Sequence, residues 1–541
     1  MKQRLRNFWG WGFSDEILPD AYISGFKRMV QLAFGLNSLD ETPPPQLSEL
    51  SLRLPRFSLP SDLKSFCTQE TYDRANHAYG KSFRDMVRAI NRNFDNPPDY
   101  VAYPSTEEDI IALMSFCAEN EIALIPYGGG SSVVGGVEPT GEHHYKGSMS
   151  CDMMNFDKII HVNDRSRTAR IQAGIYGPAL EAGLKPFGLT IRHFPQSFEF
   201  STLGGWIATR AGGHFATLYT HIDEFVQSLR IITPKGMIET RELPSAGDGP
   251  DANRFFIGSE GIFGIITEAT MRLQSIPSIR SSAVVRFSDE KAALEVTRRI
   301  SQCGLHPANA RLISAMESFS MGIGNGADTV LLLGFESHDH DQEPKLSRAL
   351  DICKEGGGRW DVSDVSVRRG NEAAAPETSE QWKTNFLRAP YIRNTLVRCG
   401  IIMETFETVT TWDNLETFHT KIIGTVETAV RETCGNGIVM WRFTHLYPDG
   451  PVIYYTVIAP GRRGEELAQW DAIKAAASDA IIANHGPITH HHAVGRDHLP
   501  WFEKQCPKLF LSVLHGMKSN LDPGWILNPG VLMKPPFNKS G

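Results

Sequence analysis

A short apolar run that ends in three consecutive glycines constrains this chain more than any other feature. Residues 122–126 (IALIP) have the composition of a buried strand, and the chain leaves it through Gly128-Gly129-Gly130. Because glycine has no Cβ, its backbone can approach an anionic group, whose oxygens the N–H groups and the Ser131 and Ser132 hydroxyls can bind. A plain tight turn is the alternative. The GxGxxG pattern and its following acidic residue are missing, so we do not predict a Rossmann site.

Two later segments repeat this combination of glycines and hydroxyls. The first, PQSFEFSTLGGWIATRAGG at Pro195–Gly213, places serines and threonines between paired glycines. The second, FFIGSEGIFGIITEATMRL at residues 255–273, has Gly258-Ser259-Glu260-Gly261 before a strand that holds Gly264. Three such loops, each beside a strand, suit one extended ligand that combines phosphates with a ring system.

Composition limits the classes of protein that fit. With 541 residues, the chain is long enough for two or three domains. Its net charge of −8 does not favour binding to nucleic acid, which is also negatively charged. The 8 cysteines are scattered without a CxxC pair, which favours reduced thiols in a cytosol-like compartment. The chain has no long apolar run that would span a membrane, and we expect that its first residues are not a secretory signal.

Alternating strand and helix patterns divide the chain into parts. Residues 1–65 combine a helical stretch with a proline-rich linker. From residue 100 to about 273, short strands alternate with helices, the clearest of which follows Ser105, its expected N-cap. From about Ser281 the order becomes strand, helix, strand, strand, helix, and Arg462–Asn484 is the strongest helix prediction. This alternation predicts α/β or α+β layers.

The N-terminal residues combine basic and aromatic side chains. Such a segment can touch a lipid interface, or it can pack its aromatic rings on the body of the protein; the sequence leaves both interpretations open. The side chains concerned are Lys2, Arg4, Arg6, Phe8, Trp9, Trp11 and Phe13.

Three adjacent histidines, His490–His492, follow the strong helix. Adjacent residues on a strand alternate faces, which is a poor arrangement for a metal cage, and we predict no metal ligands. The segment HDHDQE at residues 338–343 resembles a ligand set but fits a solvated loop. Histidines that line a ligand can accept or donate protons, and we favour this interpretation. Arg442, which precedes the strand that carries Tyr454, is either a second anion contact or part of a structural salt bridge.

The three loops, in this order, resemble the FAD domain of the vanillyl-alcohol oxidase and p-cresol methylhydroxylase superfamily over about residues 96–277. The resemblance implies FAD, with its pyrophosphate at the first loop and the other two loops beside the flavin. No histidine stands in or just after the first loop, so we expect non-covalent FAD. The implied cofactor-binding residues are Pro126, Tyr127, Gly128, Gly129, Gly130, Ser131, Ser132, Pro195, Gln196, Ser197, Phe198, Glu199, Phe200, Ser201, Ala208, Thr209, Arg210, Ala211, Ser259, Glu260, Gly261, Ile262, Phe263, Gly264 and Ile265.

Over nearly its whole length the chain resembles the alkyldihydroxyacetonephosphate synthase family. The matching segments include NFWGWGF, PQSFEFSTLGGWIATRAGG, PYIRN, ETFETVTTWDNL and LDPGWILNPG. In that family an arginine matching Arg393 contacts the substrate phosphate, and a tyrosine matching Tyr454 is the acid/base. Three histidines matching His490, His491 and His492 are needed for activity. An asparagine matching Asn528 lies near the flavin.

The resemblance implies a reaction without net redox change. The acyl group of acyl-dihydroxyacetone phosphate is exchanged for a long-chain fatty alcohol through a flavin N5 adduct, a step of ether-lipid synthesis. Several departures leave the substrate open: Ala493 stands where the family usually has glycine, Gln196 stands where an aspartate is common, and the strand after Tyr454 (YYTVIAP) is less aromatic and differs by one residue in its spacing to the histidines. The alternative is an FAD-linked oxidase or dehydrogenase of a 2-hydroxy acid or related alcohol.

Pattern and resemblance together predict a mixed α+β fold. We expect a two-subdomain p-cresol methylhydroxylase-type FAD-binding domain and an α+β cap domain with an antiparallel sheet. The predicted parts are an N-terminal helical and linker segment (1–95), the FAD-binding domain (96–277), the cap (278–484) and a C-terminal segment that returns to the active site (485–541). We also expect a homodimer in the cytoplasm, with peripheral contact at the inner face of the membrane.

Overall fold

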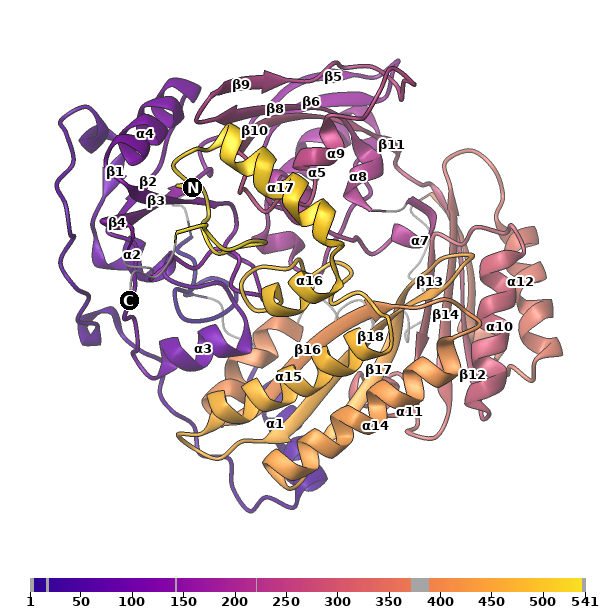
Figure 1. Ribbon diagram of the computed structural model, residues 1–541. Coiled ribbons are helices and arrows are strands. Elements are labelled where there is room, and N and C mark those ends of the chain that lie inside the picture. The colour runs from indigo at the N-terminus through magenta and orange to yellow at the C-terminus, as the bar shows by residue number, and fades with distance from the viewer. Residues whose placement is uncertain (1–3, 16–18, 142–143, 220, 371–388, 538–541) are drawn as a thin grey trace.

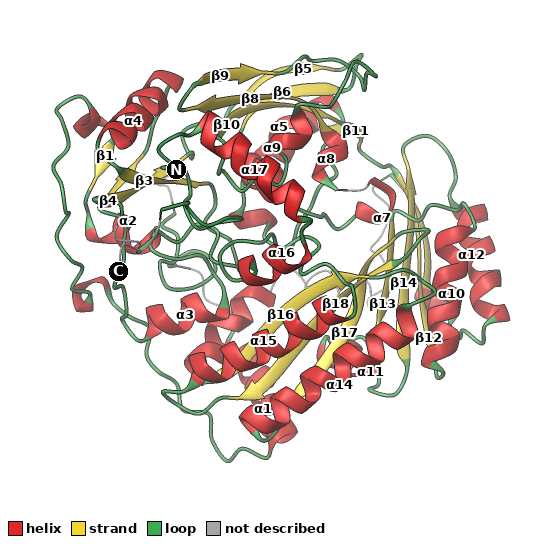
Figure 2. Cartoon of the chain, in the orientation of Figure 1, coloured by secondary structure: helices red, strands yellow, loops and turns green. Residues whose placement is uncertain are grey.

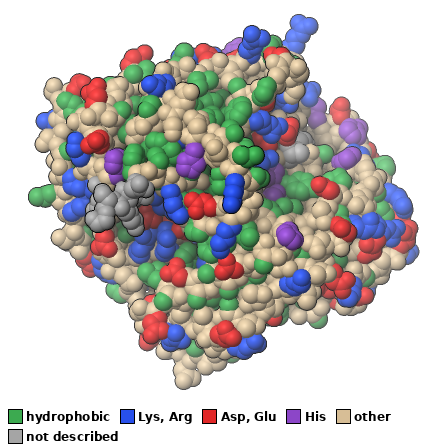
Figure 3. All heavy atoms as spheres, in the orientation of Figure 1, with side chains coloured by type: hydrophobic (Ala, Val, Ile, Leu, Met, Phe, Trp, Pro, Cys, Tyr) green, Lys and Arg blue, Asp and Glu red, His purple; other side chains and the backbone are tan. Residues whose placement is uncertain are grey.

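The computed structural model describes residues 4–15, 19–141, 144–219, 221–370 and 389–537. Two smaller sheets occupy one side of the molecule, and one large sheet with its helices occupies the other (Figure 1). No helix within these ranges is long and apolar enough to cross a membrane. Acidic and basic side chains are interspersed on the face drawn in Figure 3. All 8 cysteines are free thiols.

The first sheet contains the strand that delivers the chain into the glycine loop. Its order is β1 (Cys67–Thr68), β2 (Tyr100–Ala102), β4 (Gly147–Asp152) and β3 (Ile122–Tyr127), and β2, β4 and β3 are parallel. Helix α4 (Glu107–Glu119) packs beside it. The N-cap of α4 is Thr106 rather than the expected Ser105, because the Asp109 N–H donates to Thr106 Oγ1 at 3.1 Å.

The second sheet is antiparallel and contains a hairpin that turns at residues 234–236. Its strands lie in the order β5 (Ile159–Asn163), β6 (Thr168–Gln172), β10 (Ile265–Arg272), β8 (Val226–Thr233) and β9 (Gly236–Glu239). The pair β7 (Leu189–Thr190) and β11 (Gln274–Ser275) lies apart. The helices of this part are α5 (Gly177–Leu184), α6 (Leu203–Thr209), α7 (Ala216–Tyr219), α8 (Ile222–Phe225) and α9 (Asn253–Phe256).

The third sheet confirms the predicted antiparallel cap. Its order is β15 (Val365–Arg369), β12 (Ile279–Phe287), β14 (Thr329–Ser337), β13 (Asn309–Ile313), β17 (Ile438–Leu446), β18 (Pro451–Pro460) and β16 (Ile401–Val409). Figure 2 shows helices over one face of this sheet. They are α10 (Glu290–Gln302), α12 (Glu343–Glu355), α14 (Leu415–Cys434) and α15 (Glu466–Ala483), while α11 (Ala315–Ser320) follows β13.

Side chains of β16, β17 and β18 alternate between the two faces of this sheet, as the pleat requires. Tyr455 and Val457 belong to the core beneath α14 and α15. Tyr454, Thr456 and Ile458 point to the opposite face and line a cavity. Every second side chain of β16 and β17 points to this face too, so the three strands form one continuous wall of the cavity.

The two ends of the chain tie the sheets together. Leu527 forms a parallel bridge with Leu124 of β3, so the C-terminal segment returns to the first sheet. Near the N-terminus, the Trp11 N–H donates to Asn394 Oδ1 at 2.8 Å and the Asn394 side chain donates to the Trp11 carbonyl at 2.9 Å. The terminal helices are α1 (Asp20–Phe34), α2 (Thr71–Asn76), α3 (Phe83–Ile90), α16 (Leu499–Gln505) and α17 (Lys508–Leu521).

The structure decides between the two interpretations of the N-terminal aromatic side chains. Trp11 is buried, with its ring 6.3 Å from that of Phe200, and Phe13 contacts the same ring. Phe8 packs on Phe94 at 6.2 Å. These three rings therefore cover the body of the protein. Lys2 lies outside the described residues.

Candidate active site

A large cavity lies between the glycine loops and the wall of β16–β18. Its volume is about 550 Å³, within the range of small-molecule sites. The first loop (Gly128–Val133) and the start of the second (Pro195–Ser197) form one side, and Arg393 and Tyr454 lie on the other. The predicted flavin loops and the predicted substrate residues therefore share one space.

The first loop must be glycine for reasons of packing. A Cβ on Gly129 would lie 1.7 Å from the Phe200 carbonyl oxygen, and one on Gly128 would lie 2.3 Å from Thr202 Oγ1. Gly130 has a φ of 69°, in the left-handed region. The backbone is therefore pressed against the second loop, and its opposite edge faces the cavity.

The exposed edge of this loop fits a diphosphate. Within the described part of the chain, the backbone N–H groups of residues 128–132 have no hydrogen-bond acceptor. Consecutive unpaired N–H groups beside serine hydroxyls are the donor set that phosphate oxygens require. The residues present thus fit the pyrophosphate of FAD.

The second loop is held in shape by its own side chains. Thr202 is the N-cap of α6, and its Oγ1 accepts the Gly205 N–H. Ser201 Oγ accepts the Trp206 indole N–H at 2.7 Å. These contacts place Gly205, Trp206 and Thr209 along the cavity wall.

The third loop lies behind the first. A Cβ on Gly261 would contact Pro126 at 2.9 Å, which places this loop against the end of β3. The buried Glu260 carboxylate accepts the Val494 and Gly495 N–H groups, each at 2.9 Å, and Asn528 donates to the Glu260 carbonyl at 2.8 Å. Burial raises the pKa of Glu260 to about 7. This loop therefore ties the C-terminal segment to the flavin loops.

The predicted cofactor residues divide into two groups. Those that line the cavity are Gly128, Gly129, Gly130, Ser131, Ser132, Pro195, Gln196, Ser197, Ser201, Thr209 and Ala211. Those placed elsewhere, whose flavin contact stays a prediction, are Pro126, Tyr127, Phe198, Glu199, Phe200, Ala208, Arg210, Ser259–Ile265 and Asn528.

Tyr454 is buried in the wall opposite the loops. Arg442, its cross-strand neighbour on β17, holds its guanidinium 3.9 Å from the centre of the tyrosine ring. The Arg442 side chain forms a buried ion pair with Glu317 of α11. The structural salt bridge considered for Arg442 is thus present, and the pair fixes the plane of the Tyr454 ring.

Arg393 lies in the same wall, at the cavity. It is buried, and its Nη2 donates to Thr405 Oγ1 at 3.4 Å. Within the described residues it has no carboxylate partner, unlike Arg442. A buried guanidinium without a carboxylate suits an anionic ligand such as a phosphate.

Glu407 of β16 organises the triple histidine. Its fully buried carboxylate accepts the backbone N–H groups of His490, His491 and His492 at 2.7, 2.9 and 2.8 Å, and the Thr489 hydroxyl at 2.7 Å. The three histidines therefore lie on a loop wrapped around one anion rather than on a strand. The sequence argument from alternating faces does not apply to them.

The histidine rings gather beside Tyr454. The rings of His491 and His492 lie 6.1 and 5.5 Å from the tyrosine ring. Burial, as the largest cause, lowers the pKa of His491 and of His492 to about 3 and the pKa of His490 well below its usual range. The triplet is therefore neutral at physiological pH, and each ring has one N–H donor and one acceptor nitrogen for hydrogen bonds with a group in the cavity.

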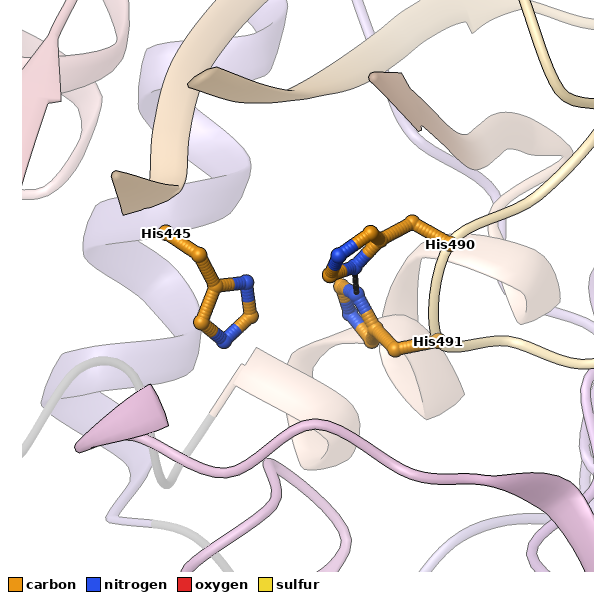
Figure 4. A group of neighbouring side chains, drawn as sticks. All are labelled: His445, His490 and His491. Carbon is orange, nitrogen blue, oxygen red and sulfur yellow. Dashed lines mark hydrogen bonds between the residues drawn. The ribbon is translucent and has the colours of Figure 1, made fainter. Parts of the chain in front are cut away.

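Other residues of this cluster were not predicted. His221 Nε2 lies 3.1 Å from His490 Nε2 and 2.7 Å from the Tyr447 hydroxyl. His445 of β17 points toward His490 and His491 (Figure 4). No motif marks His221, Tyr447 or His445. Glu407 lies within the resemblance segment ETFETVTTWDNL, to which no role is attached, and it pairs with Tyr454 across the strands.

The cavity continues away from the histidines into an apolar arm. Met403, Met440 and Ile458 line it from the sheet, and Tyr22 and Phe26 of α1 line it from the other side. One end of the space thus offers cations, a phenol and imidazoles, and the other end offers hydrocarbon.

Comparisons with known proteins agree with this architecture. The FAD binding domain family matches residues 98–241, and the C-terminal domain of FAD linked oxidases matches residues 276–532. Alkyldihydroxyacetonephosphate synthase of Dictyostelium discoideum is 29% identical over 521 residues, which cover 93% of this chain and 83% of that protein. A solved alkyldihydroxyacetonephosphate synthase has a TM-score of 0.80 at 23% identity and covers 97% of this chain and 98% of its own. p-Cresol methylhydroxylase has a TM-score of 0.67 at 13% identity, with 96% and 98% covered.

These findings define an FAD-dependent enzyme of the FAD-linked oxidase class, with the p-cresol methylhydroxylase-type fold. The predicted cofactor and fold class are confirmed. Within that class, the chain is similar over most of its length to alkyldihydroxyacetonephosphate synthases.

Proposed function

We propose that this enzyme exchanges the acyl group of acyl-dihydroxyacetone phosphate for a long-chain fatty alcohol. The observation that carries the proposal is that Arg393, without a carboxylate partner in the described chain, opens into the same cavity as Tyr454 and the apolar arm. A phosphate at Arg393 places a short three-carbon unit near the phenol, and a hydrocarbon chain extends along the arm. A small 2-hydroxy acid would leave that arm unfilled.

In this proposal the side chains divide the work of the exchange. Arg393 binds and orients the phosphate dianion. Tyr454, held by Arg442, moves the proton next to the substrate ketone as the acid/base, and the neutral rings of His491 and His492 lie beside its ring, where they can form hydrogen bonds with the reacting groups. When bound, FAD supplies a ring system that can accept and return an electron pair, so no external oxidant is needed.

The test is an incubation of the FAD-loaded enzyme with acyl-dihydroxyacetone phosphate and labelled hexadecanol, analysed by mass spectrometry. We expect a labelled ether product and free fatty acid, and a loss of at least about 100-fold in kcat for Tyr454→Phe. Arg393→Met should raise KM because it removes the phosphate contact. Bleaching of the flavin by a 2-hydroxy acid without oxygen, in the absence of ether product, would overturn the proposal in favour of an oxidase or dehydrogenase.

We also propose peripheral contact with the inner face of a membrane, which would give the enzyme access to both lipid substrates. Helix α1 supports this: Tyr22 and Phe26 border the apolar arm, while Leu32 on the same helix is 75% exposed. Co-sedimentation with anionic phospholipid vesicles should decrease for Leu32→Glu. The homodimer and the cytoplasmic location stay predictions. Light scattering of the purified protein tests the homodimer.

A further inference from the structure

Three histidine rings converge beside the cavity from two distant parts of the chain. His445 comes from β17, whereas His490 and His491 come from the loop that Glu407 holds (Figure 4). One ring nitrogen of each lies within 4.8 Å of the others, a spacing open to a shared metal ion. The expectation of no metal ligands considered neither the loop nor His445.

One ring nitrogen of His445, Nδ1, has no hydrogen-bond partner in the described structure. Its Nε2 lies 3.0 Å from the Gly213 carbonyl oxygen, which can only accept, so Nε2 carries the proton. The neutral ring therefore presents a lone pair at Nδ1, which is buried and has no hydrogen-bond partner in the described structure. Metal-bound histidines characteristically donate their second nitrogen to a carbonyl in this way.

His490 has a similar arrangement. Its Nε2 contacts the Tyr447 hydroxyl and His221 Nε2, each at 3.1 Å, which leaves Nδ1 directed at His491. The two Nδ1 atoms of His490 and His491 are 3.2 Å apart. Two nitrogens at about 2.05 Å from a tetrahedral zinc ion are separated by about 3.3 Å, so this pair already has the required spacing.

We propose that His445, His490 and His491 form a three-nitrogen site for a divalent cation of the zinc class. Imidazoles favour such ions over magnesium or calcium, and a three-histidine set leaves a fourth position toward the cavity. The Glu407 carboxylate serves as an outer support, because it already accepts four hydrogen bonds from the loop. A bound ion would occupy the histidines that the exchange uses, so it would suppress that reaction; this consequence rests on the proposed function, but the binding does not.

The test measures metal binding rather than turnover. FAD-loaded protein is freed of metal with a chelator, titrated with Zn²⁺ by calorimetry, and analysed by X-ray absorption at the zinc edge. We expect one ion per chain with nitrogen ligands at about 2.0–2.1 Å. His445→Gln should weaken binding at least about 100-fold, and Tyr447→Phe about tenfold, with flavin absorbance unchanged.

A matched control comes from the exposed loop at residues 338–343. His340 lies beside Asp339 there, and both are solvent-exposed. His338→Gln with His340→Gln should leave the zinc stoichiometry and affinity unchanged. Absence of stoichiometric binding, or binding that survives both His445→Gln and Tyr447→Phe, would overturn the metal site. Neither readout involves substrate. The metal site can therefore be disproved while the proposed exchange reaction holds, and the exchange reaction can be disproved while the metal site holds.

Discussion

Glu407 holds His491 by its backbone: Glu407 Oε1 accepts the His491 N–H at 2.9 Å, while the amides on either side bind the same carboxylate. Three successive N–H groups around a buried anion form a concave anion-binding turn of the kind usually seen around phosphate. Here the anion belongs to the protein, and it sets the position of the histidine rings relative to Tyr454.

Glu407→Gln should separate loop geometry from folding. An amide presents one NH₂ group to N–H donors, so at least one hydrogen bond is replaced by a repulsive contact. Hydrogen bonds to charged groups contribute about 1.5–3 kcal/mol each, and we expect the free energy of unfolding to fall by roughly 2–4 kcal/mol. Because the rings would shift from Tyr454, kcat should drop at least about tenfold with KM little changed.

Glu404→Gln is the control for that variant. Glu404 lies on the same strand but faces α15, where it accepts from the Trp470 indole at 2.6 Å and from Lys474 at 2.9 Å. Removing the Glu404 carboxylate should lower the free energy of unfolding, while the kcat of the folded protein should stay unchanged. Equal kcat losses in both variants, measured on protein with matched flavin content, would contradict the positioning role of Glu407.

Gly129→Ala should abolish flavin binding. The added Cβ would meet the Phe200 carbonyl oxygen at 1.7 Å, and backbone at that distance must move. Overpacking of this kind costs about 1–3 kcal/mol and displaces the N–H groups that face the diphosphate. The measurement is the ratio of flavin to protein absorbance after gel filtration.

Gly424→Ala provides the comparison. Gly424 lies within α14 and an added Cβ would meet nothing within 4 Å. Alanine should raise stability by about 0.5–1 kcal/mol, with flavin content unchanged. If Gly129→Ala retained full flavin, the packing argument for the first loop would be wrong.

The local parts of the site could be predicted from the sequence, because each is formed by residues that are consecutive in the chain. The strand before Gly128, the hydroxyls of Pro195–Ser201 and the helix that ends near Asn484 all depend on short-range chemistry. The strand and helix order of the cap followed from the same periodicities.

Contacts across the sheet could not be predicted in this way. Arg442 meets Tyr454, and Glu407 meets Tyr454 from the other side, because three strands pair in a particular register. A single sequence does not specify register: the segment ETFETVTTWDNL contains Glu407 but does not show which residues its carboxylate contacts, and His445 lies in no motif. The position of the third loop could not be predicted either: Ser259–Ile265 has the composition of a flavin loop and packs behind the first loop, and its flavin contact stays a prediction.

Ala493→Gly should stabilise the loop that follows the triple histidine. Ala493 has a φ of 74°, where an L side chain is strained by about 1–2 kcal/mol. Glycine should recover about 1 kcal/mol, after its greater unfolded-state entropy is subtracted. Ala112→Gly within α4 should have the opposite sign and cost about 1 kcal/mol, because that position is helical. Chemical denaturation of both variants checks the difference, and a destabilised Ala493→Gly would contradict it.

His193 links stability to pH. It lies 5.1 Å from the Trp206 ring, and neither ring nitrogen has a hydrogen-bond partner in the described structure. Burial lowers the pKa of His193 from 6.5 to about 3. The folded state therefore keeps this ring neutral, while the unfolded chain binds a proton below pH 6.5, so its contribution to stability is lost progressively between pH 6.5 and about 3.

His193→Leu removes that proton uptake and leaves every other titrating group in place. The free energy of unfolding of the variant minus that of the parent should be roughly constant above pH 7. As the pH falls from 6 to 4, this difference should increase by about 1.4 kcal/mol per pH unit. Urea denaturation at matched pH values measures this difference. A difference that does not change with pH would mean that the folded protein also protonates His193, which requires water or a carboxylate to reach a ring that the structure places among Trp206 and Phe225.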